Sequence, residues 1–393
     1  MVEIPVVVAT EPTVGNQDCF GCAPHQEFLV SVMIRIHLLS PGFTSPNGAA
    51  FLFPLLKFHE SLRQSGMMLK LFFRIEDDLT DCDVLLVDSK FHKFQWSRNR
   101  EQVLEQFGQW AEQARVIYCD TTDSSGSLQS ELLPIVDKYA KSQLLHDKQA
   151  YCRPLYGNRF FADYYHKSKG VFDSSPEWST PVRDKEGLNK LVLSWNTGLA
   201  DYSLWGPDLM KVYRRLPIKS LLRFSKPLYV ADKHRPLDVS CRFGITYHRE
   251  TVAWQRQQIR ELMRNQLRTD KLNRRQYFKE LMSSKVVVSP FGWGEITLKD
   301  FEVFITGGLL LKPTLDYMDT WPNLFIAEET MATFDWDLQN FLAVLDEVLR
   351  DVPRRTHIAR EGQRRYAKYT SGSEAAHLFV NHFKNMIAFN ENR

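Results

Sequence analysis

Two glycines, Gly292 and Gly294, lie in a short loop between the apolar run 286–288 and a segment whose apolar residues recur at helical spacing. A strand, a glycine loop and a helix in this order expose backbone N–H groups at the helix N-terminus, where a phosphate can bind. The apolar run 309–311 predicts the next strand, so the segment is a βαβ unit. In an open parallel sheet, such a loop lies at the carboxyl ends of the strands, beside the ligand.

Three charged residues, Glu295, Lys299 and Glu302, are spaced four and three residues apart, so they share one helix face. A lysine one turn into the helix can meet a diphosphate, and a carboxylate near the loop can bind sugar or ribose hydroxyls. The same spacing also fits a solvent-exposed helix face with i,i+4 ion pairs. Spacing alone leaves both interpretations open.

The run SPFGWGE, followed by K-D-F-E, a glycine pair, an apolar strand, K-P and T-W-P, resembles the donor site of a glycosyltransferase family with the GT-B fold. The resemblance covers roughly residues 235–351. It implies a nucleotide-sugar donor and a role in building bacterial or viral surface polysaccharides. By this resemblance the donor site would include Gly292, Trp293, Gly294, Lys299 and Glu302.

Two positions depart from the family pattern. Many retaining GT-B enzymes carry two glutamates eight residues apart, whereas Glu295 and Glu302 are seven apart. Lys299 stands where the family more often has arginine. Glu295 is predicted to be catalytic, but its exact role and the retaining or inverting outcome stay open.

Length and composition indicate a globular enzyme of two domains. The 393 residues exceed one ordinary core, and 44% hydrophobic with 25% charged residues is typical of soluble proteins. A net charge of +3 does not indicate a nucleic-acid partner. No run approaches the ~18 apolar residues of a membrane span, and no secretory signal is visible. Six cysteines favour a reducing compartment. We therefore expect a cytoplasmic protein.

Strand and helix patterns alternate along the chain, which predicts an α/β fold of two Rossmann-like parallel-sheet domains facing a cleft. The predicted N-terminal, acceptor-side domain spans 1–215, and a linker spans 216–234. The nucleotide-sugar-binding domain would span 235–370. GT-B chains commonly end with a helix that crosses back to the first domain, and 371–393 has the place and length for one.

The first domain also opens with a strand (32–39), a turn-rich loop (40–48) and a helix (49–62). Asn47 and Gly48 end this loop and are predicted on the acceptor side of the cleft, with an ordinary βα connection as the alternative. Before it, 4–8 could form an edge strand. Cys19, Cys22 and His25 lack the second cysteine pair of a structural zinc site, which favours free thiols.

Asp120 and Asp123 follow a predicted strand at 116–119, at the end where chemistry is usually placed. They are candidates for an acceptor-facing general base or hydroxyl ligand. An Asx-turn and cap serving a helix over 127–136 is the alternative.

The segment 137–165 is rich in aromatic and cationic residues that can stack on sugar rings and bind anions. Together with the D-x-x-D-S motif at 120–124, its K-x-Q and R-F-x-x-D-Y-Y motifs resemble the first-domain region of the same family, in the same order. Lys141 and Arg159 are therefore predicted near the cleft on the acceptor side. Loop packing is the alternative.

In the second half, a strand at 236–241 is followed by Arg242 and Gly244, and then by a helix from 250 to about 267. This placement resembles a second phosphate-facing loop. Arg249 could pair with donor phosphates. Surface charges at a helix start are an equally open interpretation.

Two D-x-D pairs could hold a divalent cation. Asp81 and Asp83 precede a strand, the wrong end for a donor site, and Asp335 and Asp337 precede a helix that they could cap. We expect no metal and no cofactor besides the nucleotide sugar. The basic stretch 213–227 fits either peripheral contact with an anionic membrane or a linker, and its prolines favour the linker.

These features predict a metal-independent glycosyltransferase that moves a sugar from a nucleotide-sugar donor to a glycan or lipid-linked acceptor. Closing the domains would exclude water. A nucleotide-sugar epimerase or hydrolase of the same fold is one alternative, and a non-catalytic glycan-binding scaffold is another. The identities of the sugar, the nucleotide and the acceptor, and the oligomeric state, do not follow from the sequence.

Overall fold

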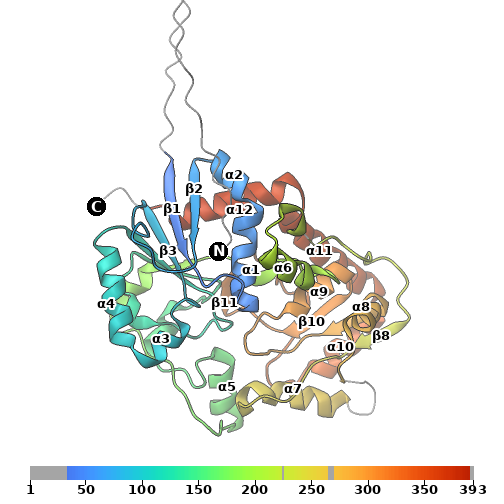
Figure 1. Cartoon of the computed structure of the whole chain (residues 1–393). Coiled ribbons are helices and arrows are strands. Elements are labelled where there is room, and N and C mark those ends of the chain that lie inside the picture. Colours follow the sequence, from blue (N-terminus) through green and yellow to red (C-terminus); the bar gives the residue numbers. More distant parts are fainter. Residues whose placement is uncertain (1–32, 224, 264–269, 390–393) are drawn as a thin grey trace, which may run out of the picture. The chain divides into compact units, whose positions relative to one another are not determined.

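The computed structural model describes residues 33–223, 225–263 and 270–389 (Figure 1). The predicted edge strand at 4–8 and the group of Cys19, Cys22 and His25 lie outside these residues.

The first sheet consists of six parallel strands in the order β2-β1-β3-β4-β5-β7. Every residue of β3 is buried, as expected for a parallel sheet covered on both faces. The strands are β1 (Ile34–Leu39), β2 (Met67–Phe72), β3 (Val84–Asp88), β4 (Arg115–Asp120), β5 (Lys138–Lys141) and β7 (Leu191–Leu193).

The second sheet has four parallel strands in the order β12-β10-β9-β8. A separate antiparallel pair joins β6 to β11. With two parallel sheets and helices between their strands, the predicted α/β fold class is confirmed. The strands are β8 (Leu237–Ser240), β9 (Ser284–Val288), β10 (Leu309–Pro313), β12 (Ala332–Phe334), β6 (Gln143–Leu145) and β11 (Met318–Thr320).

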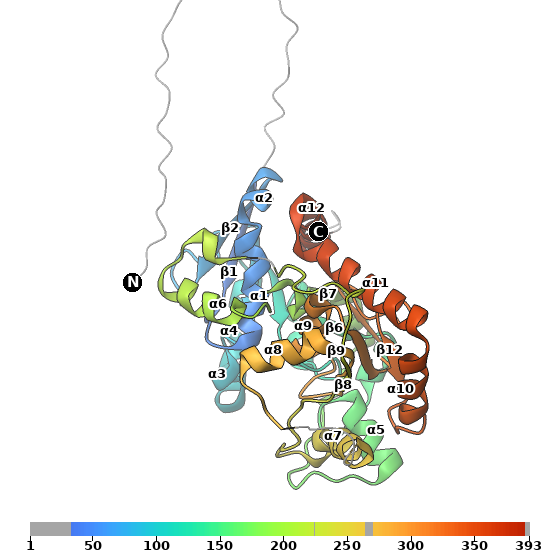
Figure 2. The ribbon, with the colours of Figure 1, turned by 90° about the vertical axis from the view of Figure 1, so that its right-hand side faces the viewer.

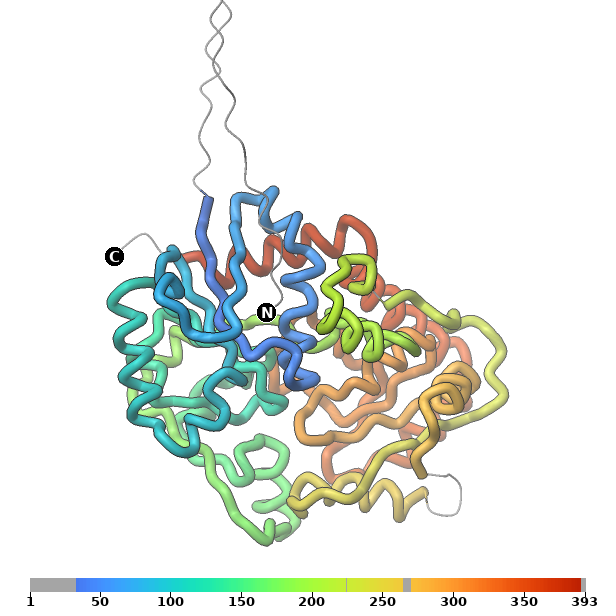
Figure 3. Tube along the Cα trace, viewed as in Figure 1, coloured from blue at the N-terminus to red at the C-terminus, as the bar shows by residue number. Residues whose placement is uncertain are grey.

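Helices connect the strands of both sheets, and the trace in Figure 3 follows them from blue to red. In Figure 2, α8 and α9 lie beside the second sheet. The helices that precede the first strand of the second sheet in the sequence are α1 (Pro46–Lys57), α2 (His59–Gln64), α3 (Lys93–Arg98), α4 (Arg100–Ala111), α5 (Phe160–Lys169) and α6 (Gly206–Arg215). The later ones are α7 (Glu250–Met263), α8 (Arg274–Ser283), α9 (Leu298–Thr306), α10 (Phe341–Arg350), α11 (Val352–Thr370) and α12 (Gly372–Ile387).

The predicted strand, glycine loop, helix and strand are observed as β9, the loop 289–297, α9 and β10. Thr297 and Asp300 form a capping box at the start of α9, which satisfies backbone donors that a helix start leaves unpaired. Gly307 ends the helix in the left-handed conformation, at φ 69°. The sequence therefore sets both ends of the helix that carries the predicted donor motif.

Core packing joins segments that lie far apart in the sequence. One hydrophobic cluster contains Phe53 and Phe161 together with Val287 and Leu310 from the second sheet. The last helix, α12, packs its Phe379 against the cluster around the first sheet, and it contacts α2 (Figure 1). The predicted domain boundaries at 215, 234 and 370 stay predictions.

One segment differs from the sequence prediction, and another agrees with it. The helix considered over 127–136 is reduced to a short 3-10 turn, Ser130–Leu132, and the N–H of Gln129 before it donates to the Tyr139 hydroxyl at 3.0 Å. The chain at 213–227 is helical up to Arg215, where α6 ends before Pro217, as expected from the proline ring. The sequence analysis predicted no helix or strand at β5, β6, β11, β12, α3, α5 or α6.

Candidate functional site

A cavity of about 250 Å³ lies between the glycine loop and the loop that follows β4. We refer to it as the loop cavity. One wall is formed by the glycine loop, by Thr297 at the start of α9 and by Arg256 of α7. The other wall includes Asn47 of α1 and Asp123. Segments that are far apart in the sequence thus converge on one hollow.

The glycines of this loop are required by close packing within the protein. A Cβ atom at Gly294 would lie 2.0 Å from the carbonyl oxygen of Asp123, far inside any real contact. A Cβ at Gly292 would lie 3.1 Å from a guanidinium nitrogen of Arg256. Glycine at 294 therefore lets the loops of the two sheets touch, and glycine at 292 lets a cation approach.

Arg256 is the residue that the sequence interpretation missed. Its guanidinium donates to the carbonyl oxygens of Phe291 and Gly244, and only 8% of the residue is exposed. Burial lowers its pKa. It occupies the buried face of α7 with Val252 and Ile259, so a cation at an apolar position of an amphipathic helix was the available signal.

Asp123 and Asn47 form the opposite wall. The side-chain amide of Asn47 donates to the Asp123 carboxylate and, at 3.2 Å, to the Thr121 carbonyl oxygen. Because Asn47 lies in the first turn of α1, that helix holds the loop after β4 in place. Gly48 lies in the same turn, where its N–H donates to the capping hydroxyl of Ser45 at 3.1 Å, and it does not line the cavity.

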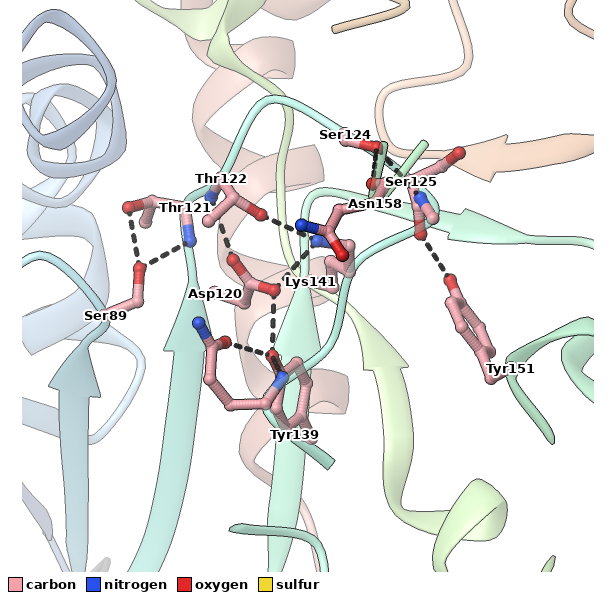
Figure 4. A network of polar contacts seen from close by, with 12 residues as sticks. Ser89, Asp120, Thr121, Thr122, Ser124, Ser125, Tyr139, Lys141, Tyr151 and Asn158 are labelled. Atoms are coloured by element: carbon pink, nitrogen blue, oxygen red, sulfur yellow. Dashed lines mark hydrogen bonds and ion pairs between the residues drawn. The ribbon is translucent and has the colours of Figure 1, made fainter. Parts of the chain in front are cut away.

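Asp120, a candidate for the base or a hydroxyl ligand, and Lys141, predicted near the cleft on the acceptor side, do not line this cavity. Their charged groups pair at 2.8 Å with both side chains fully buried (Figure 4). Tyr139 donates to the same carboxylate at 2.8 Å, and the N–H of Thr122 donates to its other oxygen at 2.9 Å. Burial raises the pKa of Asp120, but Lys141 outweighs it, so the pKa lies below its ordinary value. The hydrogen bond from the Thr122 N–H to the Asp120 side chain is the Asx-turn that the sequence analysis gave as the alternative for Asp120.

Glu295, the third predicted catalytic residue, is completely buried. Its carboxylate accepts hydrogen bonds from the N–H and the hydroxyl of Ser125, at 3.1 Å and 2.6 Å. Ser125 belongs to the loop after β4. Glu295 therefore joins the two loops, and its side chain is not part of the cavity lining.

Lys299 and Glu302 do not line the loop cavity, and their expected diphosphate and ribose contacts stay predictions. Glu302 pairs with Arg274 of α8 at 3.1 Å, and burial raises its pKa. Lys299 donates to the carbonyl oxygen of Arg242, and burial lowers its pKa to about 8. Both side chains are occupied by contacts within the second half of the chain.

The remaining candidates divide between two places. Arg242 pairs with Glu280 and with Asp270, each at 2.9 Å, and these hydrogen bonds raise its pKa. Gly244 contributes only its carbonyl oxygen, to Arg256. Arg159 and Arg249 line a second cavity of about 470 Å³.

The first D-x-D pair has partners within the protein, and the second does not cap α10, whose N-cap residue is Asn340. Asp81 pairs with Arg35 at 2.7 Å, and Asp83 accepts the N–H of Arg35 at 2.7 Å. In the part of the chain that the structure describes, no group of three His, Cys, Asp or Glu residues could hold a metal ion. The expectation of a metal-independent site stays a prediction. Among the same residues, no helix is long and apolar enough to cross a bilayer.

No family model matches the chain, and no curated protein matches it in sequence. Similar solved structures include HepE from Anabaena in complex with UDP-glucose, at 9% identity and TM-score 0.41, covering 90% of this chain and 100% of that chain. A glycosyltransferase from Rickettsia africae ESF-5 is similar at 8% identity and TM-score 0.42, covering 92% and 100%. An alpha-glucosyltransferase in complex with UDP and DNA is similar at 10% identity and TM-score 0.43, covering 91% and 100%. Because these TM-scores lie below 0.5, the likenesses carry no conclusion about this chain.

Proposed function

We propose that the chain is a GT-B glycosyltransferase that moves a sugar from a nucleotide-sugar donor to a glycan or lipid-linked acceptor in surface polysaccharide synthesis. One observation carries the proposal. The loop cavity sets a glycine loop, a helix N-terminus and a buried cation opposite a carboxylate. The sequence resemblance adds the nucleotide-sugar class. The proposed location is the cytoplasm, with at most peripheral contact to a membrane.

The donor side of the cavity suits a diphosphate. The helix dipole of α9 favours an anion near its N-terminus, in addition to the capping box that binds the N–H groups of Thr297 and Asp300. The guanidinium of Arg256 supplies a fixed positive charge beside Gly292. Both would stabilise the charge that develops on the leaving nucleoside diphosphate as its bond to the sugar breaks.

The acceptor side offers Asp123 as the proton acceptor. In the proposed transfer, the acceptor hydroxyl oxygen bonds to the anomeric carbon while the bond from that carbon to the diphosphate oxygen breaks. Asp123 takes up the hydroxyl proton, and Asn47 holds the carboxylate through its hydrogen bond. The retaining or inverting outcome stays open.

The loop cavity must widen to admit a donor. Its volume of about 250 Å³ lies below the ~300–1,000 Å³ of typical small-molecule sites. Gly294 touches Asp123, and Glu295 bonds to Ser125, so these two contacts hold the loops together. We propose that donor binding separates them and that they close again over the bound sugar.

The first test is thermal stability with a panel of UDP-, GDP-, dTDP- and CMP-sugars. A ligand that binds only the folded state stabilises it by about 2.7 kcal/mol at 100 times its dissociation constant. We expect one nucleotide class to raise the melting temperature. No shift with any donor would contradict the proposed donor site and favour the scaffold alternative.

The second test replaces the proposed base. Asp123→Asn should keep the donor-induced shift and lose about 10²–10⁴-fold in transfer, the usual contribution of a general base. Asp208→Asn is the matched control, because Asp208 is an exposed aspartate paired with Lys211 at 2.9 Å. Transfer at the control's rate in Asp123→Asn would refute the assigned base. Donor turnover without acceptor would favour an epimerase or hydrolase.

A further inference from the structure

The second cavity, of about 470 Å³, has the size of a small-molecule site. We refer to it as the polar cavity. Thr122 and Asp123 line both it and the loop cavity, so the two hollows meet at the proposed base. A molecule bound in the polar cavity would therefore lie next to a donor bound in the loop cavity.

Two arginines from distant segments converge in the polar cavity. Arg159 and Arg249 both donate to the carbonyl oxygen of Gly157, at 2.7 Å and 2.9 Å. Burial and the neighbouring charge of Arg249 both lower the pKa of Arg159. Among the described residues, no carboxylate lies within ion-pair distance of Arg159, whereas Arg249 pairs with Glu177. Arg159 and Arg249 thus present two guanidinium groups to a cavity whose lining also includes Asp123, Glu131 and Glu177, and guanidinium groups are the preferred partners of carboxylate and phosphate.

The same cavity presents aromatic surface. Trp96 and Trp178 both contribute to its lining. Trp178 is 49% exposed and is held edge-on by Tyr156, with ring centroids 5.0 Å apart. Its position is thus fixed by packing while about half of its surface stays accessible. Exposed indole rings offer flat apolar surface and one N–H donor, which suits the faces of a sugar ring.

We propose that the polar cavity binds an anionic saccharide as the acceptor, a sugar that carries a carboxylate or a phosphate group. The anionic group would pair with Arg159 and Arg249, since guanidinium groups bind both kinds of anion through two parallel hydrogen bonds. The sugar ring would lie against Trp178, with a hydroxyl directed at Asp123. This inference rests on the proposed glycosyl transfer for its meaning, but the binding itself can be measured without any donor.

Glu177 provides a direct way to test the charge argument. Its carboxylate pairs with Arg249 and accepts a hydrogen bond from the Asn158 side-chain amide at 3.1 Å, and 53% of its side chain is exposed. An incoming anion competes with it for the same guanidinium. Removing the Glu177 charge should therefore strengthen anion binding, whereas removing the Arg249 charge should weaken it.

The experiment measures binding by calorimetry with three probes: methyl glucuronide, glucose 6-phosphate and methyl glucoside. We expect at least one acidic probe to bind about tenfold more tightly than the neutral glucoside. The better acidic probe identifies the anionic group. Arg249→Gln should weaken that binding about tenfold, and Glu177→Gln should strengthen it several-fold. Arg360→Gln, which removes an exposed arginine paired with Asp232, should change nothing.

Equal binding of acidic and neutral probes, or no binding of any probe, would overturn the inference. So would the same affinity in Glu177→Gln as in the unmodified protein, a test that stands even if Arg249→Gln does not fold. The donor-induced thermal shift is measured separately. A donor shift without acidic-probe binding therefore refutes only this inference, and acidic-probe binding without any donor shift refutes only the proposed transferase.

Discussion

At the scale of single residues, burial separates the two aspartates that the sequence placed together. Asp120 and Asp123 are three residues apart, yet Asp120 is closed off by Lys141 and Tyr139 while Asp123 lines both cavities. A charge in the protein interior is tolerated only when it is paired and hydrogen-bonded. The Asp120–Lys141 pair therefore positions the loop that carries Asp123.

The buried pair makes a stability prediction. Lys141→Met leaves the Asp120 carboxylate without its cation, so the free energy of unfolding should fall by about 3–5 kcal/mol. The double variant Asp120→Asn/Lys141→Met should recover much of this loss, because no unpaired charge remains. Urea unfolding measures both. The exposed pair of Asp81 and Arg35 is the control, and Asp81→Asn should cost about 1 kcal/mol or less. Equal losses in Lys141→Met and in Asp81→Asn would contradict the assigned role.

At the scale of elements, the glycine loop between β9 and α9 is shaped by the loop across from it. The contact between Gly294 and Asp123 leaves no space for a side chain. The Glu295–Ser125 hydrogen bonds lie directly beside that contact. A motif that sequence reasoning assigns to phosphate binding thus also fixes how the loops of the two sheets meet.

Gly294→Ala should lower the free energy of unfolding by about 1–3 kcal/mol, the usual cost of overpacking, because its methyl group collides with the backbone at Asp123. Gly108→Ala is the matched control. Gly108 lies inside α4 with nothing within 4 Å of the added atom, so alanine there should stabilise the protein by about 1 kcal/mol. Chemical unfolding measures the change in the free energy of unfolding for both variants. A neutral effect of Gly294→Ala would show that the two loops separate freely in solution.

The helix α12 carries a residue that makes stability depend on pH. His382 stacks on Trp321 with ring centroids 3.8 Å apart, and it bonds to the carbonyl oxygen of Ser194 after β7 at 2.8 Å. Burial lowers its pKa to about 4. In the unfolded chain the pKa of this histidine has its ordinary value of about 6.5. Between about pH 4 and 6.5, the unfolded state therefore binds a proton at His382 and the folded state does not. Neutral His382 therefore stabilises the folded state fully above about pH 6.5, and this stabilisation is lost as the pH falls from about 6.5 to 4.

His382→Gln should remove part of the loss of stability between pH 6.5 and 4, while His377→Gln, on the exposed face of the same helix, should not. The measurement is the melting temperature across this pH range for both variants. Identical pH profiles for the two variants would exclude His382 as the responsible group.

At the scale of the whole molecule, buried side chains from the two halves of the chain pack together in one hydrophobic cluster. Phe301 of α9 is fully buried and stacks on Tyr202, which precedes the predicted domain boundary, at 5.3 Å between ring centroids. A Cβ atom added at Gly198 would lie 2.5 Å from the ring of Phe301. The packing between the two halves is thus as close as that within a single core.

Because of this shared core, we expect the two halves to unfold in one transition despite the length of the chain. Calorimetry should give one peak with equal calorimetric and van't Hoff enthalpies, the standard test of two-state unfolding. Phe301→Ala should move that single peak to lower temperature, with a loss of about 3–5 kcal/mol. Two separate peaks, in the protein itself or in the variant, would contradict a shared core.

The sequence by itself determined the elements and the fold class. Strand and helix periods, the glycine pair after α9 and the capping residues act over a few neighbours, so 286–288, 309–311 and the helix between them could be predicted. β5 and α5 were not predicted, because tertiary contacts override weak local preferences. Of the residues that line the loop cavity, the glycine loop, Asn47 and Asp123 were named from the sequence and Arg256 was not, and the roles of all of them stay predictions.

Only the tertiary structure decided which charged residues face a cavity. Asp120, Lys141, Glu295 and Glu302 have the residue types of a sugar-transfer site, yet each has its partner inside the protein. Asp123 and Arg256 reach the loop cavity because loops from different sheets meet there. The physical reason is that charged side chains pair with residues that are close in space. The sequence gives the spacing of residues along the chain but not which distant residues the fold brings next to them.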